Sequence, residues 1–331
     1  MADIGTQLKF VNYHVGSRDV AIGFPILAAF DRDIVNVLFD ADADSIEQTR
    51  HAWQTTAACE TLVFPYCLSD SDRSETLHVN FDAYTSSIYP FNTDLSEFYT
   101  YYAAGRFDYM LGEVVRPMEQ REVAARSLDS LRREAPFRDL PPDFLSVDTQ
   151  GAELGILEGA RDALARHVLG VRVEVEFVPI YRGQPLFRQV QEALEGLGFR
   201  LAEVEVNEEF SPHRGPSGAR GRGFVLSGDA LFLRRFETLA GAVASVEQRY
   251  VMLHKLAFVA VMFERLEYAL QVLDAADRLR PPPALKKQLE SLSYYAFLRE
   301  MLAAAAALPP VRPPTMGEAM TFEQAQARFR A

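Results

Sequence analysis

The sequence predicts a doubly wound α/β domain, built on a mostly parallel sheet and followed by a helical C-terminal extension. Three observations support this fold class. Short apolar runs alternate with amphipathic helical patterns through the first two-thirds of the chain, which is typical of repeated βαβ units. Glycine or aspartate follows several of these runs, where parallel strands end. After about residue 237 helical periodicity takes over.

The predicted strands all lie within residues 1–236. Each is a short run rich in apolar and β-branched side chains, which indicates a buried strand. Amphipathic patterns predict helices over 45–53, 152–167 and 186–197, the last closed by Gly198. The predicted strands cover 10–15, 35–39, 62–66, 143–147, 171–178 and a final antiparallel pair, 199–206 and 224–234.

Two segments interrupt this pattern. Residues 70–126 contain strand-like pieces and an aromatic-rich stretch, and we expect an insertion that forms a lid or substrate wall over the crevice. Residues 207–222 are polar and rich in Gly and Pro, which predicts a flexible loop. The alternative for this loop is that its arginines cover an anionic substrate.

The second predicted domain covers 237–331, with helical patterns over 237–279 and 284–307 separated by prolines. Its apolar stripe is long for a lone surface helix. Three interpretations stay open: the extension packs on the sheet, forms a homodimer through its helices, or docks another protein. The segment that begins at Pro309 is expected to order only against a partner.

Charge and composition exclude several classes of protein. The 331 residues carry a formal charge of −12, so a general nucleic-acid binder is not expected. The two cysteines provide no disulfide framework and suit a reducing compartment. No signal-peptide pattern or apolar run of membrane-spanning length is present. We therefore expect a cytoplasmic protein with a small-molecule partner.

Three residues stand at the expected carboxyl ends of strands, where ligands bind in such sheets. They are Gly16, Asp40 and Asp148. Singly, each has an ordinary structural explanation, as a turn glycine or a helix cap. Together they favour a nucleotide-like cofactor, with Asp40 placed to accept hydrogen bonds from ribose hydroxyls. Because a G-x-G-x-x-G fingerprint is absent, a cofactor without a pyrophosphate fits better, and S-adenosylmethionine is the obvious one.

Residues 143–199 carry a more specific pattern. They contain D-x-x-G-x-E from Asp148, a strand with paired glutamates, the turn YRGQPLF and a closing Gly-Phe. This segment closely resembles the FkbM family of S-adenosylmethionine-dependent methyltransferases, and the resemblance extends over roughly residues 8–236. It implies a Rossmann-like class I methyltransferase fold.

The resemblance also implies roles for individual residues. Residues around Gly16 would contact the methionine end of the cofactor, Asp40 the ribose, and residues 68–70 the adenine. The first loop departs from the family pattern, because it reads His-Val-Gly-Ser without a nearby second glycine, and Ala41 replaces a common proline. The implied cofactor-binding residues are His14, Gly16, Ser17, Asp40, Ala41, Leu68, Ser69 and Asp148.

The candidate catalytic residues are Asp148, Glu174 and Glu176. The two glutamates are separated by two positions and point to one face of their strand, where each would raise the other's pKa. The alternative is that they pair with Arg172, Arg182 or Arg200. Carboxylates here could also hold a divalent metal, but no residue spacing requires one. The expected substrate residues are Ser86, Ser87, Gln150 and Tyr181, although the serines also suit a hydrogen-bonded turn.

The chemistry expected from these residues is O-methyl transfer to a sugar, glycan or secondary metabolite. The alternative function belongs to another class. The atypical loop at Gly16 also fits a cofactor-poor relative that binds or scaffolds partners through its C-terminal helices.

Overall fold

The computed structural model describes residues 8–16, 23–42, 46, 59–96, 101–104, 107–110, 114–211, 224–243 and 245–307. The helix expected over 45–53, most of the loop expected over 207–222 and the segment from Pro309 lie outside these residues, so those predictions stay untested. None of the described helices is long and apolar enough to cross a membrane.

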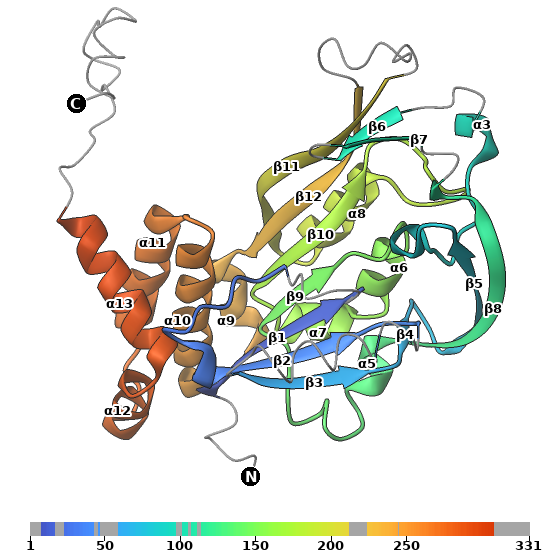
Figure 1. The fold of residues 1–331 in the computed structure, drawn as a ribbon. Helices are drawn as coiled ribbons and strands as arrows, with labels where there is room; N and C mark the ends of the chain where they lie inside the picture. Colours follow the sequence, from blue (N-terminus) through green and yellow to red (C-terminus); the bar gives the residue numbers. More distant parts are fainter. Residues whose placement is uncertain are drawn as a thin grey trace, which may run out of the picture.

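A nine-stranded sheet forms the centre of the molecule (Figure 1), in the order β3-β2-β1-β9-β10-β12-β11-β6-β7. Neighbours from β3 to β10 are parallel, and β12 and β6 run against the other strands. The mixed α/β fold with a mostly parallel sheet is therefore confirmed. The strands are β1 (Phe10–Val15), β2 (Ile34–Phe39), β3 (Glu60–Phe64), β9 (Phe144–Val147), β10 (Gly170–Glu176), β11 (Phe199–Ser211), β12 (Phe224–Arg234), β6 (Tyr101–Ala104) and β7 (Phe107–Met110).

Residues 70–126, expected as an inserted, lid-like segment, contribute strands to two sheets, and the lid role stays a prediction. The hairpin β6–β7 pairs with β11 and extends the sheet beyond the pair predicted to end it. Two further strands of the segment form a second, three-stranded sheet with β4. Its strands are β4 (Cys67–Leu68), β5 (Arg73–Asn80) and β8 (Pro117–Arg126), and the short helix η2 (Ala83–Thr85) follows β5.

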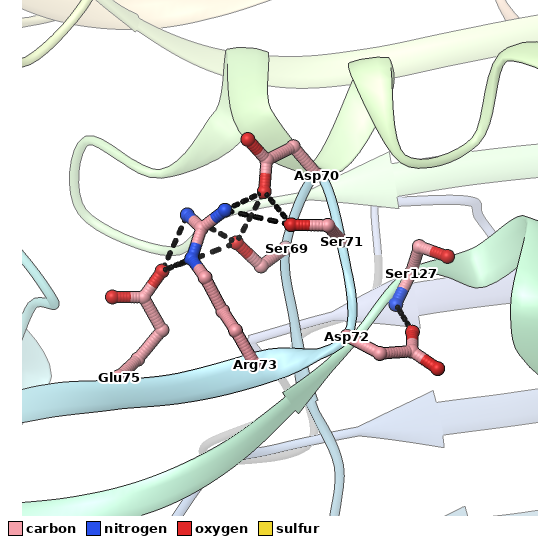
Figure 2. A network of polar contacts seen from close by, with 7 residues as sticks. All are labelled: Ser69, Asp70, Ser71, Asp72, Arg73, Glu75 and Ser127. Atoms are coloured by element: carbon pink, nitrogen blue, oxygen red, sulfur yellow. Dashed lines mark hydrogen bonds and ion pairs between the residues drawn. The ribbon is translucent and has the colours of Figure 1, made fainter.

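The turn between β4 and β5 is held by a polar network around Arg73 (Figure 2). The guanidinium of Arg73 pairs with Asp70 and Glu75, and its Nη2 donates to Ser69 Oγ at 3.2 Å. Asp72 accepts a hydrogen bond from Ser127 N at 2.8 Å. The network therefore fixes the second sheet against the chain that follows β8.

Helices α6 (Glu153–Glu158), α7 (Arg161–Arg166) and α8 (Phe187–Gly196) cover one face of the main sheet. Val11, Tyr13 and Val15 belong to a core cluster with these helices.

The single helix predicted over 152–167 is instead broken after Gly159. A Cβ at Gly159 would lie 2.0 Å from Ser69 O, so only glycine permits this approach.

The C-terminal helices pack on the opposite face of the sheet (Figure 1). Phe10 and Phe144 belong to the same core cluster as these helices. The Phe258 ring contacts Phe10 edge-on at 5.3 Å between centroids. The long apolar stripe of α10 is thus explained by burial against the chain's own core, and the boundary at 236/237 stays a prediction. These helices are α9 (Leu239–Ala242), α10 (Val246–Met262), α11 (Leu266–Asp277), α12 (Pro283–Glu290) and α13 (Ser293–Ala306).

Candidate active site

A cavity of about 300 Å³ opens at the carboxyl ends of β1, β2 and β9. The chain order of the strands reverses between β1 and β9, and such a switch point is where ligands bind in open α/β sheets. Among the described residues, every charged side chain in the lining is acidic: Asp40, Asp42, Asp148 and Glu174. The other lining residues are Val15, Gly16, Ala41, Tyr66, Cys67, Leu68, Leu77, Ala83, Tyr84, Ser86, Ser87, Ile88, Thr149, Gln150 and Ala152.

Gly16 joins β1 to the cavity through an unusually close contact. Its φ is +87°, and an added Cβ would lie 1.7 Å from the carbonyl oxygen of Asp148. Glycine is therefore required by the packing of the β1 and β9 ends against each other. Ser17 lies outside the described residues.

His14 does not line the cavity, although we expected it to bind the cofactor. It is buried, with Nδ1 2.8 Å from Ser146 Oγ. Burial lowers the pKa of His14 to about 4, against opposing effects of Asp148 and the Gly16 backbone, so the ring is neutral at pH 7. Gly23 also packs against Ser146 rather than at the cavity. His14 therefore packs beneath the cavity lining, two residues before the Gly16 turn, and holds β1 to Ser146 of β9.

Asp40 and Ala41 line the cavity at the end of β2. Asp40 Oδ1 accepts a hydrogen bond from Asp42 N at 2.8 Å, which fixes the turn after the strand. Asp42 is buried and pairs with Arg121 of β8 at 3.2 Å. The second sheet is thus tied to the wall of the cavity.

The residues expected to contact adenine separate into two groups. Leu68 is buried and lines the cavity. Ser69 is also buried, but it lies in the Arg73 network and not in the lining. Tyr66 and Cys67 line the cavity in its place. Leu68 is the last residue of β4, and neither Ser69 nor Asp70 lines the cavity.

Four carboxyl groups gather beside the ends of β9 and β10. Glu174 is partly accessible and lines the cavity, whereas Glu176 and Glu153 are buried and do not. Burial, then the nearby charges of Asp148 and Glu176, raise the pKa of Glu174 well above its usual value. Burial and the charge of Glu153 raise the pKa of Glu176 in the same way. Of the three glutamates, Glu174 is the one that lines the cavity.

The expected alternative partners of these glutamates are engaged elsewhere or make no ion pair with them among the described residues. Arg172 pairs with Asp229 at 3.0 Å and Glu205 at 3.5 Å, and Arg182 donates to the Thr93 hydroxyl. Burial therefore acts on Glu174 without a neighbouring arginine to offset it.

Glu153 stabilises the loop that carries Asp148. Its Oε1 accepts hydrogen bonds from Thr149 N at 2.8 Å, Thr149 Oγ1 at 3.0 Å and Gly151 N at 3.1 Å. Burial outweighs these bonds and raises the pKa of Glu153 to about 7. Glu153 therefore positions the loop and does not face the cavity.

Gln150 is the centre of the polar contacts at the cavity. Its Nε2 donates to Glu174 and Asp148, and its backbone φ is 59°. Its backbone oxygen accepts from Ser87 Oγ at 2.6 Å. The Tyr181 hydroxyl donates to Thr85 O at 2.6 Å and lies 3.3 Å from Gln150 Oε1. Tyr181 is buried and is not among the lining residues, so it reaches the cavity only through Gln150, and its expected substrate role stays a prediction.

Ser86 and Ser87 both line the cavity, together with the half-exposed Tyr84. The serines also stabilise the turn, because Ser86 Oγ accepts from Asn80 N at 3.2 Å and Ser87 Oγ accepts from Tyr89 N at 3.0 Å. The hydrogen-bonded turn is therefore observed, and the substrate role of the two serines stays a prediction. No group of three or more His, Cys, Asp or Glu side chains in the described part of the chain is arranged to hold a metal ion.

Sequence reasoning missed several lining residues. Asp42 and Tyr66 stand at or just after predicted strand ends, so their positions could have indicated them. Leu77, Ala83 and Ile88 carry no comparable signal, because they reach the cavity through the fold of the inserted segment.

Comparisons with known proteins identify the family of this chain. A family model described as the methyltransferase FkbM domain matches residues 29–201, more than half of the chain. No curated protein matches. Among solved structures, methyltransferase FkbM from Methylobacillus flagellatus KT is similar at 11% identity and a TM-score of 0.35, covering 68% of this chain and 44% of that chain. The chain thus spans less than half of that structure. Magnesium protoporphyrin IX methyltransferase from Synechocystis PCC 6803, solved with bound SAM, is similar at 8% identity and a TM-score of 0.34, covering 70% and 73% of the two chains.

Proposed function

Because the chain belongs to the FkbM methyltransferase family, we propose that it moves a methyl group from S-adenosylmethionine to a hydroxyl of a sugar, glycan or secondary metabolite. The observation that carries this proposal is the cavity where Gly16, Asp40, Asp148 and Glu174 meet at the ends of four strands. The strand order outward from the switch point, β1-β2-β3 on one side and β9-β10 on the other, also supports a Rossmann-like sheet.

The donor set of the cavity fits this cofactor. The described lining includes no lysine or arginine, so it offers no cation to a phosphate group. Acidic side chains complement the positive sulfonium and ammonium of S-adenosylmethionine. We assign Asp40 to the ribose hydroxyls, Leu68 to the adenine, and Gly16 with Asp148 to the methionine end. When bound, the cofactor supplies an activated methyl group.

Glu174 is the proposed general base. In an in-line transfer, the acceptor oxygen forms its bond to the methyl carbon as the carbon–sulfur bond breaks, and the hydroxyl proton must leave. A carboxylate whose pKa is raised toward the working pH accepts that proton better than an ordinary one. Gln150 holds Glu174 toward Asp148, and Ser86, Ser87 and Tyr84 offer hydroxyls to a polar acceptor.

The test is transfer of a labelled methyl group from S-adenosylmethionine to a panel of sugars, polyols and phenols. We expect Glu174→Gln to lower turnover on any accepted substrate by at least about 100-fold, in line with general-base catalysis, and to leave S-adenosylhomocysteine binding within about threefold. The matched control is Glu192→Gln, on the exposed face of α8. Equal turnover of both variants would exclude Glu174 as the base.

The competing function is a binding or scaffolding module that has lost cofactor binding. A chain that binds neither S-adenosylmethionine nor S-adenosylhomocysteine would favour it.

We also propose a homodimer through the C-terminal helices, supported by Leu270 and Met301, which are 50% and 39% exposed on α11 and α13. We also propose a cytoplasmic location, which suits the free, buried Cys59 and Cys67.

A further inference from the structure

A second and larger cavity, of about 660 Å³, lies at the opposite end of the main sheet. Leu8 and Val11, at the start of β1, and Asp143, just before β9, form its floor, and α10 and α12 supply the facing wall. Gly16 and Asp148 stand at the far ends of the same two strands. This cavity is therefore separate from the candidate active site and shares no lining residue with it.

The floor carries a buried ion pair whose charges are already satisfied. Lys255 Nζ lies 2.8 Å from Asp143 Oδ2, and the two side chains are 5% and 8% exposed. Asp143 also accepts a hydrogen bond from Val11 N at 2.8 Å, and Lys255 donates to Lys9 O at 2.7 Å. The pair therefore presents no net charge to a ligand, and an ionic ligand would gain little here.

The wall and rim of the cavity also favour an uncharged ligand. The wall is mainly apolar, with Val243, Val251, Met252 and Leu285 as its larger side chains. At the rim, Arg166 is paired with Asp162 at 2.5 Å, and Glu247 accepts from Ser245 Oγ at 2.7 Å. The two acidic side chains of the lining, Asp143 and Glu247, match its two basic ones in number, and the remaining surface suits an apolar body.

Three uncharged polar side chains belong to the lining: His167, Gln248 and Gln288. His167, directly after α7, lines the cavity and is partly accessible. Burial, then the charge of Arg132, lowers the pKa of His167 to about 4, so the imidazole is neutral at pH 7. Within the described residues its ring makes no hydrogen bond. A neutral imidazole offers one donor and one acceptor.

We propose that this cavity binds an uncharged, mainly apolar small molecule, with one polar group hydrogen-bonded to His167. The binding site does not depend on the proposed methyl transfer, since it uses none of the same residues. It is concave and mostly apolar, and it carries a few uncharged polar side chains, which is the usual make-up of a small-molecule site.

The test uses Nile red, an uncharged dye with an apolar ring system and a carbonyl acceptor, on the full chain. We expect saturable fluorescence at one dye per chain. Ala284→Trp, which adds bulk to the lining, should weaken binding by about tenfold or more. The matched control is Ala303→Trp on the exposed face of α13, outside the lining, which should bind like the wild type. His167→Phe should weaken binding about three- to tenfold.

Absence of saturable binding to the wild type, or equal affinities for Ala284→Trp and Ala303→Trp, would overturn the proposal. If the dye fluorescence per chain falls as the chain concentration rises, a second copy of the chain competes for the cavity. That result would also overturn the proposal. Should Ala284→Trp fail to fold, hydrogen exchange of the wild-type chain decides the question. Dye-dependent protection centred on α10 and α12 supports the proposal, and protection elsewhere contradicts it.

Discussion

The side-chain amide of Gln150 donates a hydrogen bond to Glu174 Oε2 at 2.7 Å and a longer one to Asp148 Oδ1 at 3.3 Å. One neutral donor thus bridges two carboxyl groups at the edge of the cavity. The backbone of Gln150 adopts a φ of 59°, a conformation that costs most residues about 1–2 kcal/mol. The strained backbone places this amide between the acids, so its position is built into the loop.

Removing this amide should affect turnover more than cofactor binding. Without the donor, Glu174 and Asp148 lose a hydrogen bond to a charged group, worth about 1.5–3 kcal/mol. We expect Gln150→Ala to lower kcat by about 10- to 100-fold and to leave S-adenosylhomocysteine affinity within about threefold. Gln150→Gly, which also relieves the strained φ, should be about 1 kcal/mol more stable than Gln150→Ala in urea denaturation. Equal kcat values for Gln150→Ala and the wild type would refute the positioning role.

The contact between Gly16 and Asp148 predicts a severe effect of the smallest side chain. Gly16→Ala combines a positive φ with a clash against the Asp148 carbonyl, so we expect a loss of about 3 kcal/mol or more in the free energy of unfolding. Gly183 provides the control, because it has a φ of +80° and nothing within 4 Å of an added Cβ. Gly183→Ala should lose only about 1–2 kcal/mol. Urea denaturation compares them, and similar losses would contradict the clash.

The buried Glu153 predicts a pH dependence of stability. Its pKa is raised from 4.5 to about 7, so between these values the folded chain keeps a proton that the unfolded chain has released. The stabilisation is complete below pH 4.5 and is lost as pH rises through 7. Glu153→Gln removes this titration but keeps the carbonyl acceptor. Between pH 5 and 7.5 the wild type should therefore lose more unfolding free energy than Glu153→Gln, by an amount on the order of 2 kcal/mol. Parallel pH profiles would show that Glu153 is not the titrating group.

The ion pair between Asp143 and Lys255 ties α10 to the sheet. Lys255→Met leaves the buried Asp143 charge unpaired, and such a change costs about 3–5 kcal/mol. Adding Asp143→Asn should recover about half of the loss, since the asparagine oxygen can still accept from Val11 N. The control is Lys9→Met in the exposed pair with Glu60, where we expect a loss under about 1 kcal/mol. The prediction is wrong if thermal or urea unfolding shows comparable losses for both single variants.

The strands of the main sheet were predictable because their signal is local. β1 and β12 begin and end at the predicted residues, since apolar runs buried on both faces leave little ambiguity. The positions of Asp40 and Asp148 followed from the ends of those runs.

Features that depend on distant contacts were not predictable. The helix break comes at Gly159, where Ser69 O packs closely, a contact between segments far apart in the sequence. His14 lies near the end of β1 and Tyr181 follows β10, but neither side chain lines the cavity. The direction of each side chain depends on strand register and on the inserted segment, which the local sequence does not reveal. The hairpin β6–β7 was missed because its aromatic residues resemble a loop wall as much as a strand pair.

The central claim is that the cavity at Asp40 binds S-adenosylmethionine, and calorimetric titration tests it most directly. The comparison is between the wild type, Asp40→Ala and Asp40→Asn, the last of which keeps an acceptor for Asp42 N. We expect micromolar affinity for the wild type and about 10- to 100-fold weaker binding for Asp40→Ala, the equivalent of about 1.5–3 kcal/mol. Asp40→Asn should fall between them. No heat of binding to the wild type, or the same affinity for all three chains, would contradict the account.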